Sequence, residues 1–143
     1  EAGGIGGRGN GTMNDCYNTE IVGAKNFESQ TYTPDADVGG IATGNEVVIQ
    51  RSYNVGLVYA EAVDSMIGGI IHNRPYSNSN IVVEFSYMIS SSSSIGPGIV
   101  LSEEEMKDIA KFIGFDFTNI WLMDESVNNG YPYLRWTIQD DSK

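Results

Sequence analysis

The chain has 143 residues, which is enough for one domain with a hydrophobic core. Nineteen acidic residues against eight basic ones give a net charge of −11, which opposes broad contact with nucleic acid phosphates or anionic lipid. One cysteine excludes a disulfide within the chain, and no apolar run is long enough to predict membrane insertion.

Three stretches of the chain share a pattern that starts with Gly-Gly-Ile and reaches a Tyr on a later strand-like segment. They run from Gly3 to Tyr17, from Gly39 to Tyr53 and from Gly68 to Tyr87. A unit that recurs every 29 to 36 residues is typical of stacked repeats, because a single unit cannot bury its apolar side alone. We therefore predict repeats over about 3–24, 39–61 and 68–90, with the isoleucines that follow each Gly-Gly pair stacked in line and the tyrosines forming an internal ladder.

Glycine, asparagine, serine and short β-branched runs indicate strands joined by tight turns. The clearest strand candidates cover residues 47–49, 55–59, 67–71 and 81–87. The polar stretch 26–37 is expected to be a loop, and the low-complexity stretch 90–98 separates the repeat region, 1–95, from a different segment, 96–143.

The second segment begins with the one strong helix pattern. Ser102 and Glu105 form a capping box, apolar residues recur at helical spacing, and Gly114 is a typical stop, so a helix is predicted over about 103–113. Strands are predicted over about 119–123 and 131–138. These elements would cover an open end of the stack as a cap, with Met106, Ile109 and Ile113 against the last repeat and Trp121 and Trp136 sealing the rim.

The predicted fold is thus mainly β: a short β-solenoid of about three degenerate repeats, closed by a C-terminal cap of one helix and two strands. Residues 1–8 begin inside the repeat pattern without a polar lid. We therefore expect the chain to be a piece of a longer protein, and its first edge to meet upstream repeats or another copy of the chain.

Some of these residues resemble a known family. Gly3-Gly4-Ile5 followed by Cys16-Tyr17-Asn18-Thr19 is similar to the GLUG-type repeats of bacterial cell-surface and adhesin-like proteins, which also occur beside immunoglobulin A peptidases. The stretch 106–117 and the ending Gly130-Tyr131-Pro132-Tyr133-Leu134-Arg135-Trp136 resemble the segment that often follows such repeats. The third repeat departs from the pattern, with Met88 in place of asparagine. The resemblance implies a β-solenoid in an exported bacterial protein and brings no catalytic residues.

One stretch has the spacing of a calcium loop. Asp35, Asp37 and Glu46 stand at positions one, three and twelve of an EF-hand pattern, with Gly40 at position six. Position five is Gly39, which offers no side-chain ligand, and no helix pattern flanks the loop. We predict no metal site and no cofactor, and keep calcium binding by Asp35, Asp37 and Glu46 as the alternative.

Other groups that could carry chemistry have simpler structural interpretations. Cys16 stands where the other repeats have serine, and a nucleophilic thiol would need an activating base such as the single histidine, His72. Glu46, Asp64 and Glu84 could flank a sugar, but none falls at matching repeat positions. Asp116, between two phenylalanines, is expected to be buried and to accept backbone N–H bonds.

The functional prediction is a non-catalytic extracellular scaffold or adhesion module, the C-terminal fragment of a larger bacterial surface protein. No catalytic residues are assigned. Expected partners are upstream repeats, another copy of the chain, or a glycan or host-matrix ligand, with no nucleic acid and no membrane insertion. The alternative is a fragment of a glycan-active β-helix enzyme, either a lyase or a glycosidase.

Overall fold

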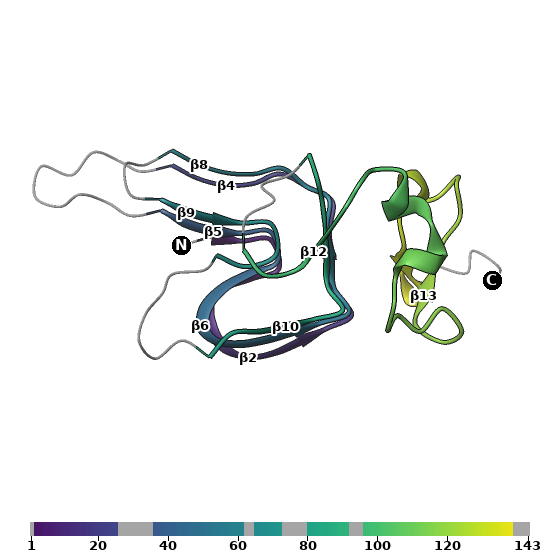
Figure 1. Ribbon diagram of the computed structural model, residues 1–143, viewed down its shortest axis with the longest axis horizontal. Coiled ribbons are helices and arrows are strands. Elements are labelled where there is room, and N and C mark those ends of the chain that lie inside the picture. The colour runs from purple at the N-terminus through teal and green to yellow at the C-terminus, as the bar shows by residue number, and fades with distance from the viewer. Residues whose placement is uncertain (1, 26–35, 62–64, 73–79, 92–95, 139–143) are drawn as a thin grey trace, which may run out of the picture.

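The computed structural model describes residues 2–25, 36–61, 65–72, 80–91 and 96–138. The described chain is mainly β, and its only helices are 3₁₀ turns of three residues each. The strands β1 to β11 come in three successive sets (Figure 1). The first set is β1 (Ala2–Gly3), β2 (Gly6–Asn14), β3 (Tyr17–Asn18) and β4 (Val22–Lys25); the second is β5 (Asp37–Gly39), β6 (Ala42–Gln50), β7 (Tyr53–Asn54) and β8 (Val58–Glu61); the third is β9 (Met66–Gly68), β10 (Val82–Glu84) and β11 (Tyr87–Ile89).

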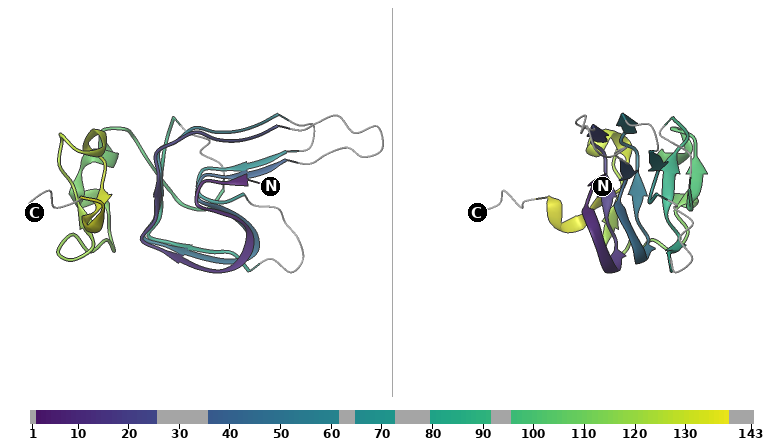
Figure 2. Two further views of the ribbon diagram at one scale, coloured as in Figure 1. Left: turned by 180° about the vertical axis from the view of Figure 1, so that it is seen from behind. Right: turned by 90° about the vertical axis from the view of Figure 1, so that its left-hand side faces the viewer.

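Strands of successive sets pair in parallel and lie side by side (Figure 2). They form separate sheets with the orders β1-β5-β9, β10-β6-β2, β12-β11-β7-β3 and β4-β8, where β12 is Ile99–Leu101. The first two sets are offset by 36 residues, as in the pair of Tyr17 with Tyr53, and β2 departs from this offset only at an irregularity where Arg8 pairs with Thr43. The offset from the second to the third set falls to 34 residues at Tyr53 and Tyr87, and to 29 from Gly39 to Gly68.

The three Gly-Gly-Ile motifs lie at one bend of the successive sets. The Ile5 N–H donates to the Ile41 carbonyl at 2.9 Å, and the Ile41 N–H donates to the Ile70 carbonyl at 2.8 Å. The predicted alignment of the three isoleucines is therefore confirmed. Ile41 and Ile70 are fully buried, whereas Ile5, on the first set, is 50% exposed. A Cβ at Gly40 would stand 2.0 Å from the Gly69 carbonyl oxygen, so this bend requires glycine.

A second bend repeats in the same way, and it uses an unusual backbone conformation. Asp15, Arg51 and Phe85 have φ values of 55°, 49° and 46°, in the left-handed region that such residues seldom adopt. The Asp15 N–H donates to the Gln50 carbonyl, and the Arg51 N–H donates to the Glu84 carbonyl, each at 3.1 Å. The hydrogen bonds to the neighbouring set hold this conformation, and each bend turns the chain from one sheet into the next.

Two main groups of buried side chains fill the interior. One lies between the sheets of β2, β6 and β10 and the Gly-Gly-Ile bends, and contains Ile41, Ala42, Val47, Ile49, Ile70, Ile71 and Met88. The other joins the tyrosines to the C-terminal segment, and contains Tyr53, Tyr87, Ile89, Leu101, Met106, Phe112, Trp121, Tyr131 and Leu134. The C-terminal segment thus shares a core with the strand sets.

The predicted helix over 103–113 is wrong. The capping box forms, since the Glu105 N–H donates to Ser102 Oγ and the Ser102 N–H donates to the Glu105 carboxylate. Only two 3₁₀ turns follow, η1 (Glu105–Lys107) and η2 (Ile109–Lys111), because Asp108 between them is extended, with φ −110° and ψ 111°. The Asp108 carboxylate accepts the Ala110 N–H at 2.9 Å, a local bond that competes with helix formation.

The C-terminal segment, residues 102–138, lies along the side of the stack formed by β3, β7 and β11 (Figures 1 and 2). The sequence instead predicted a cap over the end. Met106 and Trp121 are fully buried, as expected, but Ile109 and Ile113 are 52% and 67% exposed and Trp136 is 65% exposed, so those three predictions are wrong. The two predicted strands are confirmed only as the short antiparallel pair β13 (Trp121–Leu122) and β14 (Tyr133–Leu134), because a 3₁₀ turn, η4 (Arg135–Thr137), takes the place of the rest of the second strand.

Candidate functional site

The tyrosine ladder lies in the interior, as predicted. The rings of Tyr17 and Tyr53 stack with centroids 5.4 Å apart, and Tyr87 is in register with Tyr53 on the other side. Tyr53 and Tyr87 are buried, so their ring faces are not open to a sugar. Burial raises the pKa of both hydroxyls above the ordinary range for tyrosine.

The hydroxyl ends of the ladder are held by the C-terminal segment. Tyr53 Oη donates to the Pro132 carbonyl and accepts from Asn128 Nδ2, the latter at 2.9 Å. Tyr87 Oη donates to the Ile113 carbonyl at 3.1 Å. Each tyrosine of the second and third sets therefore has its own acceptor on the segment that covers it.

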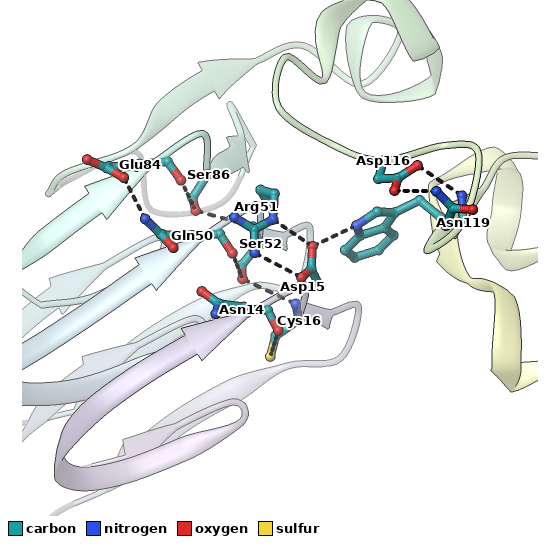
Figure 3. A network of polar contacts seen from close by, with 11 residues as sticks. Asn14, Asp15, Cys16, Gln50, Arg51, Ser52, Glu84, Ser86, Asp116 and Asn119 are labelled. Atoms are coloured by element: carbon teal, nitrogen blue, oxygen red, sulfur yellow. Dashed lines mark hydrogen bonds and ion pairs between the residues drawn. The ribbon is translucent and has the colours of Figure 1, made fainter.

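A polar network joins the first two sets to the same segment (Figure 3). Arg51 donates from Nε and Nη2 to the two carboxylate oxygens of Asp15, at 3.0 and 3.1 Å, and the Asp15 contact raises the pKa of the guanidinium. Trp121 Nε1 donates to Asp15 Oδ1 at 3.2 Å. The bidentate ion pair thus lies between neighbouring strand sets, and its carboxylate also orients the buried indole.

The small residues before each tyrosine form a ladder of their own. The Cys16 N–H donates to Ser52 Oγ, and the Ser52 N–H donates to Ser86 Oγ, both at 3.2 Å. Cys16 Sγ lies 3.3 Å from the Asn14 carbonyl, in the place that a serine hydroxyl takes in the next repeat. Burial and the neighbouring Asp15 raise the pKa of the thiol, which keeps it protonated and poorly nucleophilic.

An asparagine ladder follows the tyrosines, and our sequence analysis did not predict it. Asn18 Nδ2 donates to Asn54 Oδ1 at 2.8 Å, and Asn54 Nδ2 donates to the Gly56 carbonyl at 2.9 Å. Both asparagines are buried. The recurrence of Tyr-Asn in the first two repeats was the available signal, and Met88 ends the ladder in the third.

The described acidic residues of the possible calcium loop have different contact partners and do not meet at one site. Asp37, on β5, is buried with its Oδ2 3.8 Å from His72 Nε2, whereas Glu46, on β6, is exposed and accepts a bond from Asn10 Nδ2 at 3.0 Å. Asp35 lies outside the described residues. Among the described residues, no three His, Cys, Asp or Glu side chains are grouped to hold a metal ion.

The carboxylates considered for glycan cleavage are also separated. Glu84, on β10, accepts a bond from Gln50 Nε2 at 2.6 Å and is in register with Gln50 on β6. Glu46 lies on β6, four residues before Gln50. Four residues span about 13 Å along a strand, which exceeds the spacing of glycosidase carboxylates. Asp64 lies outside the described residues.

Asp116 has part of its predicted role. Its carboxylate accepts the backbone N–H groups of Thr118 and Asn119, both at 2.9 Å, and a side-chain bond from Asn119 at 2.8 Å. These bonds lower the pKa of Asp116, and the side-chain bond from Asn119 has a larger effect than the bond from the Asn119 N–H. The residue is only half-buried, so it shapes a turn and is not part of the core.

An open groove of about 640 Å³ lies on the C-terminal segment. Its lining residues are Lys107, Asp108, Ile109, Met123, Asp124, Glu125, Asn129 and Gly130. Lys107 Nζ is held 2.9 Å from the Glu103 carboxylate and 5.0 Å from the centroid of the Tyr131 ring. The groove combines exposed carboxylates with the apolar side chain of Ile109, and it could not be predicted from the sequence because its walls come from three separate stretches of the chain.

A smaller hollow of about 100 Å³ lies where β2 meets β6. Its walls are Gly7, Gly9, Asn10, Gly11, Thr12 and Met13 of β2 and Thr43 and Val47 of β6. Gly11 is in register with the buried Val47, so the first set has no side chain at the position where Val47 fills the second set. Thr43 is fully buried, and its hydroxyl has no hydrogen-bond partner within the described part of the chain.

Comparison with known protein families, curated proteins and solved structures finds no match for this chain. None of the helices in the described ranges is long and apolar enough to cross a membrane.

Proposed function

We propose that this chain is a non-catalytic extracellular scaffold or adhesion module, built as a short β-solenoid of three degenerate repeats within a larger bacterial surface protein. The observation that carries the proposal is the offset of 36 residues that recurs in four parallel pairings, interrupted only by an irregularity at Arg8 in the pairing of β2 with β6. A constant offset is what successive turns of a stacked repeat require. The GLUG-type resemblance of the repeats and of the C-terminal ending agrees with this setting.

The way polar groups are used also supports a structural role. The ladders of tyrosine, asparagine and serine have partners in the neighbouring set or in the C-terminal segment. Asp15 and Arg51 are likewise committed to each other and to Trp121. Residues that repeat along the stack thus stabilise it, and a reacting group would instead need an accessible partner and an open pocket.

Ligand contact is best sought at the groove of the C-terminal segment. Its open shape and its mixture of carboxylates with Lys107 and Ile109 suit a polar ligand such as a glycan or an exposed peptide. The groove lies on a segment that is anchored to all three repeats, so a bound ligand would load the stack through a shared core.

The proposal is tested by binding and turnover measured side by side. The chain is applied to a glycan array and to host-matrix proteins, and in parallel to a polysaccharide panel assayed for released reducing sugar. We expect binding without turnover, and weaker binding by the groove variant Glu125→Lys, with Glu20→Lys as the charge-matched control on the repeats. Sugar release that is abolished by Glu46→Gln, or by the corresponding change at Asp64, would establish the glycan-active enzyme instead.

A further inference from the structure

The open groove on the C-terminal segment carries an excess of negative charge. Three of its charged lining residues are carboxylates, those of Asp108, Asp124 and Glu125. The basic residue of the lining, Lys107, has its Nζ 2.9 Å from the Glu103 carboxylate, so its charge is already balanced by a neighbour. The chain as a whole has a net charge of −11, which adds to the attraction of a cationic ligand toward this surface.

The three carboxylates keep the capacity to accept further hydrogen bonds. Glu125 is exposed, and its carboxylate has no hydrogen bond or ion pair to a described residue. Asp108 and Asp124 each use one oxygen, Oδ1, for bonds within their own turns. The bond from the Ser126 hydroxyl, which has the larger effect, and the bond from the Ser126 N–H lower the pKa of Asp124. A ligand that donates hydrogen bonds and carries positive charge would therefore find acceptors along this groove.

The form of the groove distinguishes between kinds of cation. Within the described ranges, no three acidic, histidine or cysteine side chains are grouped to hold a metal ion, so the carboxylates do not surround one divalent cation. An apolar surface accompanies them, because Ile109 is 52% exposed and Met123 is half-buried. Arginine combines an aliphatic stem with a planar cationic group that has five donors. Its side chain thus matches both the apolar and the acidic parts of the groove.

We propose that this groove binds a peptide segment of a partner protein through arginine side chains, whose guanidinium groups pair with the carboxylates while their stems lie against Ile109 and Met123. Guanidinium and carboxylate groups form bidentate pairs, which fix orientation as well as add binding energy. The volume of about 640 Å³ is within the usual range of ligand sites. An acidic glycan would be repelled here, and a neutral glycan would leave the carboxylates without a matching charge. The inference rests on the proposed scaffold function, for which it names the chemical class of the partner.

Fluorescence anisotropy of a labelled peptide of about eight residues, in which arginine alternates with alanine, tests this binding to the full chain. The control peptide has citrulline, an uncharged analogue, at each arginine. We expect the arginine peptide to bind about tenfold more tightly, with a difference that shrinks as salt is added. Glu125→Gln removes one exposed ion pair and should weaken binding about two- to fivefold, and adding Asp108→Asn should weaken it further. Ile109→Ser should weaken binding by a similar factor at low and at high salt, because it removes apolar contact and no charge.

The matched control is Glu20→Gln, which removes the same charge at an exposed residue outside the groove and should leave the affinity unchanged. Thermal unfolding of the variants shows whether they remain folded. The inference would be overturned by equal binding of the two peptides, by equal effects of Glu20→Gln and Glu125→Gln, or by no binding of the arginine peptide up to about 1 mM. Glycan binding that is lost in Glu125→Lys would assign the groove to a sugar, which also overturns the inference but leaves the scaffold proposal standing. A chain that binds neither peptide, glycan nor matrix protein would count against both.

Discussion

Trp121→Ala should destabilise the whole protein and not only the C-terminal segment. The indole is fully buried, lies 4.7 Å from the ring centroid of Phe115, and contacts the rings of both Tyr17 and Tyr53. Its Nε1 donates to Asp15. The substitution therefore opens a cavity between the repeats and the segment and also removes one hydrogen bond to a carboxylate.

Truncating a buried tryptophan to alanine costs about 3 to 5 kcal/mol in free energy of unfolding. The entropy of unfolding scales with chain length, and for 143 residues it is roughly 0.3 kcal/mol per kelvin. A loss of about 4 kcal/mol thus lowers the melting temperature by about 13 °C. This loss is a large share of a typical total stability of about 5 to 15 kcal/mol.

Differential scanning calorimetry measures the change, with Trp136→Ala as the matched control. Trp136 is 65% exposed, so its truncation should change the free energy of unfolding by no more than about 0.5 kcal/mol. Equal shifts for the two tryptophans, or two separate transitions in the parent protein, would refute the reasoning that one shared core joins the segment to the repeats.

Three further changes probe the same junction. Tyr53→Phe removes one of the two donors to the Pro132 carbonyl, which keeps its bond from Asn128 Nδ2, and should cost about 1 kcal/mol in urea unfolding, whereas no loss would show that the Asn128 bond suffices. Asp15→Asn keeps a side chain suited to the left-handed backbone but removes the charge that Arg51 faces, so it should lower the free energy of unfolding by about 1 to 3 kcal/mol. The same substitution in an Arg51→Met background should cause no such loss. Burial raises the pKa of Tyr53 above its ordinary 10, so the hydroxyl stays neutral in the folded state at a pH where it ionises in the unfolded chain. The free energy of unfolding should therefore be constant below pH 10 and fall above it by about 1.4 kcal/mol per pH unit. Unfolding that is unchanged between pH 9 and 11 would contradict this.

The parallel pairing of the three strand sets could be predicted from the sequence because its signals are local and recur. Gly-Gly-Ile marks a bend at which the backbones approach closely, and the small residue followed by tyrosine marks a second bend. Position along the chain then fixes the register, because equivalent residues lie above one another in a parallel stack. The ladders follow from that register, including the asparagine ladder that the sequence pattern contained and our sequence analysis did not use.

The C-terminal segment could not be predicted in the same way, because its structure depends on contacts far apart in the sequence. Helical spacing of Met106, Ile109 and Ile113 suggested one buried face, but Asp108 bonds to the backbone of its own turn and divides the helix. Of the three apolar residues only Met106 reaches the core. Likewise, nothing local distinguishes Trp121, which meets Asp15 across 106 residues, from the exposed Trp136.

The position of the segment changes how the stack is stabilised. A cap on the end would contact only the last repeat, and each earlier repeat would depend on its neighbours alone. Along the side, the segment contacts the third set through Tyr87, the second through Tyr53, and the first through Tyr17 and Asp15. Because the segment contacts all three sets, unfolding of the segment removes contacts from each of them. The segment therefore adds contacts to all three sets beyond those that each set makes with its neighbours.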